Sequence, residues 1–268
     1  MKYKLLVLDI DGTLTNSKKL ISERTKATLI KAQEQGITIV LASGRPTYGI
    51  VPLANELQLD KFGGYILSFN GGTIINWKTK EVIQESIIKC DKLPVLHQIA
   101  ADNDVQILSY KNEFIISESA ENEYVKYEAF LNKMPIMEVK SFVDALNLDV
   151  PKCLIVGDPE KLITLEKEMN DMFGYEMSIY RSEPFFLELM PSNIDKAQSL
   201  KKLLLYTGNT REEMIACGDG FNDLSMIKFA GMGVAMANAQ PAVKEASDYI
   251  TLSNEEDGVA HVVELFLN

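Results

Sequence analysis

The feature that most constrains the fold is an alternation of short apolar runs with helical patterns along the first ninety residues. Tyr3–Leu8 and Ile37–Ala42 are continuous apolar runs, which is typical of strands covered on both faces. Between them, Thr25–Gln35 has amphipathic helical spacing, begins after the N-cap candidate Ser22 and stops at Gly36. This order predicts a parallel sheet with helices on both faces.

Polar residues directly follow three of the apolar runs. Asp9 and Ser43 come after the first two runs, and Asn70 follows a third run at Tyr65–Phe69. Asn70 and two glycines then turn the chain into Thr73–Asn76, as in a hairpin. Because catalytic groups of open α/β sheets lie at the carboxyl ends of the strands, these polar residues mark the expected site.

A different pattern begins near residue 85, where helices and strands follow one another without the regular alternation. The elements expected there are helices near 91–102, 122–133 and 160–172 and strands near 106–117, 152–156, 177–181 and 185–189. We therefore predict a second, α+β module inserted at 85–182, with 1–84 and 183–268 forming the α/β part. The alternation resumes with helices at 196–206, 223–230 and 259–267 and strands at 214–217 and 233–236.

The segment DIDGT (9–13) closes the first strand with two carboxylates. Side chains at positions i and i+2 point to the same side of an extended chain, and Gly12 permits a sharp turn. One carboxylate can attack phosphorus, while the other protonates the leaving oxygen and later deprotonates water. Repulsion between the like charges is expected to raise one pKa, so that the second aspartate, Asp11, can act as an acid near neutral pH. The alternative is a turn that needs Asp and Gly only for its backbone.

A second acidic segment, with the sequence GDGFND (218–223), follows another apolar run. Magnesium prefers hard oxygen ligands in an octahedron and usually keeps some waters. Asp9, Asp219 and the main-chain carbonyl of Asp11 can supply three oxygens, which leaves positions for phosphate and water. The two acidic segments together therefore predict a Mg²⁺ site.

Asp223 lies four residues beyond Asp219, and two roles are open to it. It can orient the site or reach the cation through a water molecule. Asn222 and Asp223 are also good N-cap residues for the helix that follows, and Asp223 can serve both purposes. The small Gly218 and Gly220 permit a close approach of the backbone.

Two further residues stand where phosphate binding is expected. Ser43 lies at a strand end before a helix that Pro46 is suited to begin, so its hydroxyl and the following N–H groups can hold a phosphate oxygen. Lys196 opens a helix after the strand expected at 185–189 and can neutralise a transferring phosphoryl group. Taken singly, a Ser-Gly turn and an exposed lysine are commonplace, and only their position after strand ends gives them weight.

The order of DIDGT (9–13), SGRP (43–46), Lys196 and GDGFND (218–223) resembles the haloacid dehalogenase superfamily. The segment SFNGG (68–72), the long insertion and the C-terminal runs VAMANA and VKEASDYIT are similar to its Cof-type, type IIB sugar-phosphatase branch. The resemblance covers nearly the whole chain. That branch commonly has a glycine after the motif lysine, whereas here an alanine follows Lys196.

The resemblance implies a Rossmann-like core with a mobile cap that selects the substrate. It implies that Asp9 is the nucleophile and that Asp11 is the general acid/base. The residues expected to hold or support Mg²⁺ are Asp9, Asp11, Asp219 and Asp223. The residues expected to bind phosphate or substrate are Gly12, Ser43, Gly44, Lys196 and Asn222. The expected activity is hydrolysis of a small phosphorylated metabolite, with sugar phosphates ahead of cofactor or nucleotide phosphates.

The composition narrows the choice of partner and compartment. A formal net charge of −11 without a long basic run argues against nucleic acid and anionic membranes as partners. No stretch approaches the roughly 18–20 apolar residues of a membrane span, and the apolar run before Asp9 is too short for an export signal. The widely spaced Cys90, Cys153 and Cys217 predict buried free thiols in a reducing cytoplasm.

Three other functions share parts of this pattern. A receiver-like phosphoacceptor domain also uses strand-end aspartates, Mg²⁺ and a lysine, but it is shorter, uncapped and lacks the second aspartate. A phosphomutase shares the nucleophile but returns the phosphoryl group to the sugar. A ligand-binding protein without activity is disfavoured because every motif carboxylate is present. The polar candidates for substrate contact in the cap are His97, Tyr110, Arg181 and Glu183, although a surface or structural position is expected for each.

Overall fold

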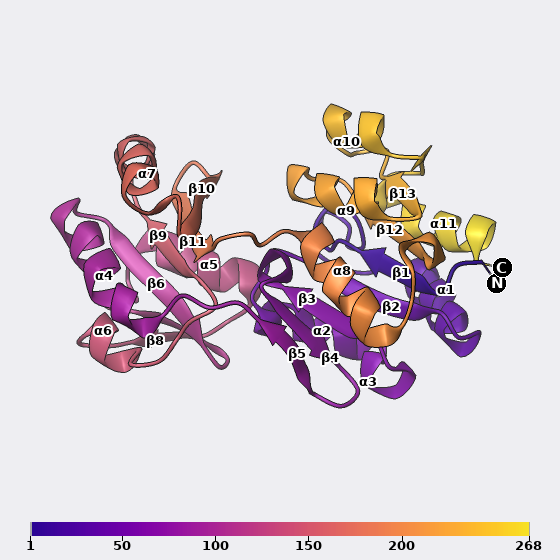
Figure 1. Ribbon diagram of the computed structural model, residues 1–268, viewed down its shortest axis with the longest axis horizontal. Helices are drawn as coiled ribbons and strands as arrows, with labels where there is room; N and C mark the ends of the chain where they lie inside the picture. Colours follow the sequence, from indigo (N-terminus) through magenta and orange to yellow (C-terminus); the bar gives the residue numbers. More distant parts are fainter. Residues whose placement is uncertain (1, 268) are drawn as a thin grey trace. The chain divides into compact units, whose positions relative to one another are not determined.

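The computed structural model describes residues 2–267, which form two compact units. Among the described residues, the core unit comprises 2–84 and 195–267, and the inserted unit comprises Glu85–Ile194. The second junction lies at 194/195 and not at the expected 182/183, because the strands around 177–191 belong to the sheet of the inserted unit. The chain passes into the inserted unit and back once (Figure 1).

The core unit is built on an eight-stranded sheet with the strand order β14-β13-β12-β1-β2-β3-β4-β5. The strands are β1 (Leu5–Leu8), β2 (Thr38–Ala42), β3 (Tyr65–Ser68), β4 (Thr73–Asn76), β5 (Val82–Glu85), β12 (Met214–Gly218), β13 (Met232–Ala235) and β14 (Tyr249–Ile250). The strands from β14 to β3 are parallel, and β4 pairs antiparallel with β3 as the expected hairpin. Strand β1 is central: Leu5 pairs with Thr38 on one side and with Met214 on the other.

Helices cover both faces of the core sheet (Figure 1). They include α1 (Glu23–Glu34), α2 (Thr47–Glu56), α3 (Leu59–Phe62), α8 (Lys196–Thr207), α9 (Leu224–Phe229), α10 (Pro241–Ala246) and α11 (Gly258–Phe266). Leu6 and Leu8 of β1 share a hydrophobic cluster with α1, α2 and α11, whereas Leu5 and Val7 share the opposite cluster with α8. The continuous apolar runs of the sequence are therefore strands buried on both faces, as expected.

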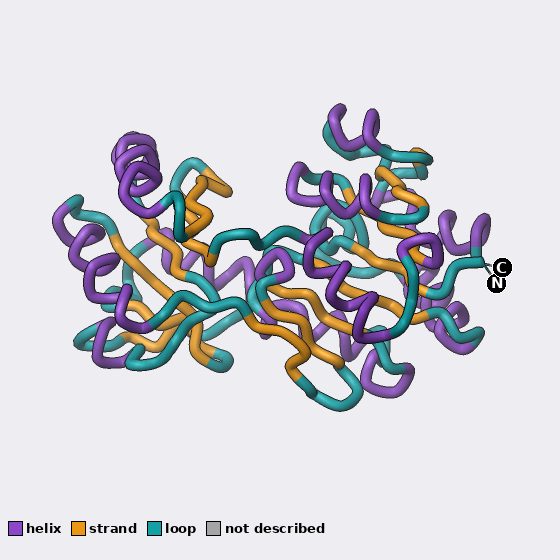
Figure 2. The backbone as a smooth tube through the Cα atoms, viewed as in Figure 1, coloured by secondary structure: helices purple, strands orange, loops and turns teal. Residues whose placement is uncertain are grey.

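The inserted unit has a six-stranded sheet with the order β10-β11-β9-β6-β7-β8. Its strands are β6 (Gln106–Lys111), β7 (Phe114–Ser117), β8 (Ile136–Glu138), β9 (Cys153–Val156), β10 (Met177–Glu183) and β11 (Phe186–Pro191), and its helices are α4 (Leu93–Asp102), α5 (Glu123–Asn132), α6 (Phe142–Ala145) and α7 (Pro159–Phe173). Figure 2 shows these strands and helices mixed along the chain. One hydrophobic cluster joins α4, α6 and α7 to one sheet face, while α5 supplies Glu128 to Tyr110 on the other.

The expected α/β core with an inserted α+β module is confirmed, and the longer elements begin and end within about two residues of expectation in most cases. Helix α1 begins after Ser22, whose side chain accepts a hydrogen bond from Thr25 N as an N-cap. The elements that the sequence did not predict have six residues or fewer: α3, β5, β8, α6, α10 and β14. Such short segments carry too little hydrophobic periodicity to be recognised.

Within residues 2–267, no helix has both the length and the apolar character that a membrane crossing requires. The three cysteines are free thiols, and Cys153 and Cys217 are buried. The expectation of a buried thiol is wrong for Cys90, which is exposed at the start of a short 3-10 helix in the inserted unit.

Candidate active site

The expected site residues gather at the carboxyl edge of the core sheet. Strands β12, β1 and β2 are parallel neighbours, so the loops that follow them leave the sheet at the same edge. Asp9 N donates to Cys217 O at 3.0 Å, which continues the β1–β12 pairing by one residue. Ser43 N donates in the same way to Leu67 O of β3 at 2.9 Å. The apolar strands therefore fix where the polar loops begin.

Lys196 begins α8 and is fully buried at this edge. Its Nζ donates to Asp9 Oδ1 at 2.7 Å, to Asp223 Oδ1 at 2.6 Å and to Ala42 O at 2.8 Å. Burial alone would lower the pKa of Lys196, but the negative charges of Asp223 and Asp9 outweigh burial and raise it. The alternative of an exposed helix lysine is wrong, because three acceptors hold a charged ammonium inside the protein.

Asp9 is only 5% exposed and lies among other carboxylates. Its burial and the negative charge of Asp223 raise its pKa well above the usual value, although Lys196 acts in the opposite direction. Asp9, Asp219 and Asp223 each offer an oxygen within 4.8 Å of the others. One lysine therefore does not balance the negative charge that is gathered here.

Asp219 approaches the turn after β1 very closely. Thr13 Oγ1 donates to Asp219 Oδ1 at 2.8 Å, and Gly12 has a φ of +84°. A Cβ added at Gly12 would overlap the Asp219 carboxylate, so only glycine fits both the backbone and the space. Burial is the main cause that raises the pKa of Asp219 to about 6, and the charge of Asp223 adds to it against the Thr13 hydrogen bond.

Asp223 is fully buried, and both of its oxygens accept hydrogen bonds. Oδ1 accepts from Lys196, and Oδ2 accepts from the main-chain N–H groups of Asp219 and Gly220, each at 2.9 Å. A Cβ at Gly218 would collide with the Asp223 side chain. The geometry favours the orienting role for Asp223, and the same side chain also caps the start of the short 3-10 helix Phe221–Asp223.

Asp11 lies in an ion-pair cluster that the sequence did not predict. Arg45 donates to both of its oxygens, from Nη2 to Oδ1 at 2.7 Å and from Nε to Oδ2 at 2.8 Å, and Lys19 Nζ donates to Oδ1 at 2.7 Å. Burial would raise the pKa of Asp11, but the hydrogen bonds and charges of Arg45 and Lys19 outweigh it and lower the pKa. The expected rise in the pKa of Asp11 is therefore wrong, because two cations face this carboxylate.

Ser43 and Gly44 form the loop after β2. Ser43 is buried, and its Oγ accepts from Arg45 N at 3.2 Å. Gly44 lies against Asn70, whose Oδ1 also accepts from Asn222 Nδ2 at 3.1 Å. The loops after β2, β3 and β12 thus meet at the edge where Asp9 and Lys196 lie.

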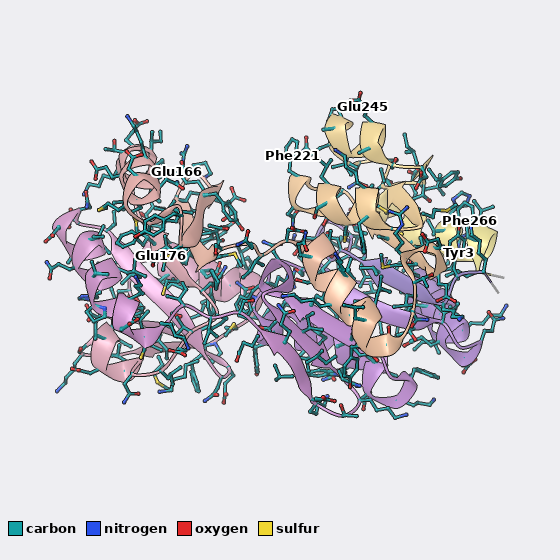
Figure 3. All side chains as sticks on the ribbon, in the orientation of Figure 1. Tyr3, Glu166, Glu176, Phe221, Glu245 and Phe266 are labelled. Carbon is teal, nitrogen blue, oxygen red and sulfur yellow. The ribbon has the colours of Figure 1, made fainter. Side chains whose placement is uncertain are left out.

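Several residues at this edge were missed by the sequence reasoning. Arg45 stands inside the SGRP segment (43–46), and its charge beside two acidic motifs was the available signal. Thr13 stands likewise inside DIDGT. Lys19 gave no signal, because its ion pair with Asp11 depends on the path of the loop between them. Phe221, labelled in Figure 3, is the exposed aromatic residue of the GDGFND segment.

Three of the four polar candidates of the inserted unit have structural partners. His97 Nε2 lies 3.0 Å from Glu118 Oε2, and its ring stacks on Phe142. Arg181 Nε donates to Glu166 Oε2 at 2.8 Å, and Tyr110 OH donates to buried Glu128 Oε1 at 2.6 Å. The fourth candidate, at position 183, is exposed at the end of β10. These placements agree with the expected surface or structural positions.

Comparison with known proteins assigns the family. The family model of the haloacid dehalogenase-like hydrolases matches residues 6–263. A Bacillus subtilis protein, YxeH, is 32% identical over 262 residues, which is 97% of each chain. Another protein of that organism, 5-amino-6-(5-phospho-D-ribitylamino)uracil phosphatase YcsE, is 30% identical over 266 residues, covering 97% of this chain and 94% of the relative.

Solved structures agree with the family match. A haloacid dehalogenase-like hydrolase from Bacteroides thetaiotaomicron has a TM-score of 0.96 and 60% identity, covering 98% of this chain and 99% of its own. The subclass IIB sugar phosphatase BT4131 has a TM-score of 0.82 and 28% identity, covering 98% of both chains. The fold and the strand-edge aspartates thus define a phosphoryl-transfer enzyme of the α/β class. The chain belongs to the haloacid dehalogenase-like hydrolase family.

Proposed function

We propose that this protein is a Mg²⁺-dependent phosphatase that forms an aspartyl-phosphate on Asp9. The observation that carries the proposal is the buried contact between Lys196 Nζ and Asp9 Oδ1 at 2.7 Å, at the edge where the other acidic residues gather. The ammonium holds one carboxylate oxygen of Asp9 and so orients the other for attack on phosphorus. Asp9 follows a buried central strand, which keeps the nucleophile rigid.

Asp9, Asp219 and the main-chain carbonyl of Asp11 fit the hard oxygen ligands that Mg²⁺ prefers. Three carboxylates meet here with one lysine, and burial together with the charge of Asp223 raises the pKa values of Asp9 and Asp219; a bound cation would offset both causes. Asp223 orients the residues around the cation rather than binding it directly, since its oxygens already accept hydrogen bonds from Lys196 and two main-chain N–H groups. When bound, Mg²⁺ supplies positive charge to the phosphoryl oxygens.

We assign phosphate binding to the loops that meet at the same edge. Ser43 offers its hydroxyl, and Gly44 allows the backbone to approach an oxyanion closely. Lys196 supplies a fixed positive charge, and Asn222 supplies an amide donor. Gly12 contributes by letting the turn after β1 pass close to Asp219.

The chemistry divides between Asp9 and Asp11. In the first half-reaction, Asp9 attacks phosphorus, the bond to the leaving oxygen breaks, and Asp11 gives that oxygen a proton. In the second, water attacks phosphorus, Asp11 accepts its proton, and the bond to Asp9 breaks to release phosphate. The pair with Arg45 holds Asp11 as a carboxylate, which is the form that the second half-reaction needs. For the first, the arriving substrate must loosen this pair so that Asp11 carries a proton.

The substrate that we propose is a small phosphorylated metabolite, with sugar phosphates first and cofactor or nucleotide phosphates second. One structural relative is named a sugar phosphatase, and one sequence relative is named for a phosphorylated ribitylaminouracil. We assign selection among leaving groups to the inserted unit, because every acidic and phosphate-binding motif belongs to the core unit. The inserted unit can therefore vary without altering the chemistry.

The experiment is a phosphate-release screen over sugar phosphates, nucleotides and cofactor phosphates, with Mg²⁺ or with excess EDTA. The expected result is many turnovers of at least one ester with Mg²⁺, none with EDTA, and none for Asp9→Asn. An isomerised sugar phosphate without free phosphate would identify a phosphomutase instead. A single phosphorylation per chain without turnover would identify a receiver-like phosphoacceptor.

A further inference from the structure

The turn after β3, Phe69–Gly71, has an unusual backbone. Phe69, Asn70 and Gly71 all have positive φ, at 53°, 55° and 94°. Residues with a Cβ adopt this left-handed region rarely, and an aromatic residue does so at a clear steric cost. Strain of this kind persists only where the surroundings impose it, and it concentrates at functional sites. The contacts of the turn therefore indicate which neighbouring groups its strained conformation holds in place.

One set of contacts joins this turn to the loop after β2. Asn70 N donates to Ser43 O at 2.9 Å, and Phe69 N donates to Arg45 O at 3.0 Å. The side chain of Asn70 also lies against Gly44, where an added Cβ would be only 3.3 Å from Asn70 Oδ1. The left-handed conformation thus directs two main-chain donors and one side chain onto the Ser43–Arg45 loop.

A second set of contacts reaches the other loops of the site. Asn222 Nδ2, from the acidic segment after β12, donates to Asn70 Oδ1 at 3.1 Å. Gly71 O accepts from Ser199 Oγ at 2.8 Å, and Ser199 lies one helical turn beyond Lys196 on α8. A Cβ at Gly71 would overlap the Ser199 side chain, so this approach also needs glycine. The turn therefore touches each element that carries an expected phosphate-binding side chain.

We propose that Asn70 is a positioning residue for phosphate binding, a role that rests on the proposed function. Its amide oxygen fixes the orientation of the Asn222 amide, so that the second Nδ2 hydrogen of Asn222 keeps a constant direction. Its backbone and side chain hold the Ser43–Gly44 loop at a fixed distance from Asn222. Asn70 acts through these groups, and preorganised donors of this kind lower the cost of binding an oxyanion.

The test separates the side chain of Asn70 from its backbone conformation. Asn70→Gly accepts the left-handed φ without strain and removes only the amide, whereas Asn70→Ala removes the amide and retains the strain. Asn222→Ala and the Asn70→Gly/Asn222→Ala double variant complete a mutant cycle. Asn112→Gly is the matched control, because Asn112 also has a positive φ of 54° but lies in the β6–β7 turn of the inserted unit.

Asn70→Gly should raise KM for p-nitrophenyl phosphate and the inhibition constant of inorganic phosphate together, by about three- to tenfold, the range expected for one hydrogen bond. The rise should be equal for alkyl phosphates, because the leaving group does not meet these loops in the proposed arrangement. Asn222→Ala should have a similar effect, and the double variant should be no worse than either single variant. Asn112→Gly should keep wild-type constants.

A binding readout keeps the inference testable without turnover. Inorganic phosphate with Mg²⁺ should raise the Tm of the wild-type protein and of Asn112→Gly, and the increase should be smaller for Asn70→Gly. The inference is overturned if Asn70→Gly keeps the wild-type KM and phosphate-induced Tm shift, or if Asn70→Gly and Asn222→Ala have additive effects. It is also overturned if phosphate does not shift the Tm of the wild type. A wild type that binds phosphate but hydrolyses no ester would contradict the proposed phosphatase alone.

Discussion

Replacing Lys196 by methionine removes the cation between two buried carboxylates. Lys196 has no exposed surface and three acceptors, and two of them are the charged Asp9 and Asp223. Removal of one partner from a buried ion pair costs about 3–5 kcal/mol, which is a large part of the roughly 5–15 kcal/mol that stabilises a folded domain. Lys196→Met should therefore lose about 3–5 kcal/mol of unfolding free energy at neutral pH without metal.

The loss of stability in Lys196→Met should depend on pH, and the direction of that dependence follows from the pKa of Asp9. Without Lys196, burial raises the folded-state pKa of Asp9 further above its unfolded value. A carboxyl with a raised pKa stabilises the folded state while it is protonated and loses that contribution as pH rises through the folded pKa. The deficit of Lys196→Met against the wild type should thus be smallest in acid and grow toward neutral pH.

The assay is urea unfolding followed by the fluorescence of Trp77. This is the single tryptophan of the chain, and it is packed into the hydrophobic cluster of the core unit, so it reports on the unit that holds Lys196. Lys152→Met is the matched control: Lys152 is also buried and donates to Glu188 Oε2 at 2.8 Å, but it lies in the inserted unit. It should leave the Trp77 transition, which reports on the core unit, nearly unchanged. Wild-type unfolding free energy for Lys196→Met at pH 7 would refute the reasoning.

Three further expectations concern Asp11, Asp219 and the inserted unit. Asp11→Asn should slow turnover of p-nitrophenyl phosphate by about 10²–10⁴-fold, and rapid-quench kinetics should find the phosphoenzyme accumulating, because water then lacks its base. The pKa of Asp219 is about 6 in the folded protein against 3.8 when unperturbed, so metal-free stability should fall as pH rises from about 4 through 6. After allowance for partial exposure this amounts to about 1–2 kcal/mol, and Asp219→Asn should abolish it in urea titrations. Exchange of residues 85–194 for those of a relative with another substrate should move the kcat/KM preference but not the Mg²⁺ requirement; an unchanged preference in an active chimera would contradict the assigned role.

The positions of the aspartates that we propose for catalysis could be predicted because local patterns decide them. A run of apolar residues followed by DIDGT or GDGFND predicts a strand and the edge at which it ends. The contact of Lys196 with Asp9 joins residues 187 positions apart, and no spacing rule gives it. Only the order of strands and helices favoured phosphate binding by Lys196 over the alternative of an exposed helix lysine.

The environment of Asp11 and the second unit boundary could not be predicted for a related reason. Arg45 and Lys19 reach Asp11 through long side chains, and their directions depend on loops that have no periodic pattern. Strand β11 pairs locally with β10 and also with β9, whose residues lie 30 to 36 positions earlier, so its place in the inserted unit depends on a distant strand rather than on its own sequence. Long-range strand pairing thus accounts for the shifted unit boundary, and the long side chains of Arg45 and Lys19 account for the unexpected environment of Asp11.

The central claim, that Asp9 carries the phosphoryl group, is tested most directly by trapping the intermediate. Wild-type protein and Asp9→Asn are mixed with Mg²⁺ and a turned-over phosphate ester, quenched in acid and reduced with borohydride, which converts an aspartyl-phosphate into homoserine. Peptide mass spectrometry should then find homoserine at position 9 in the wild type and at no aspartate in the variant. Homoserine at another position of the wild type, or phosphate on a residue other than aspartate, would contradict the account.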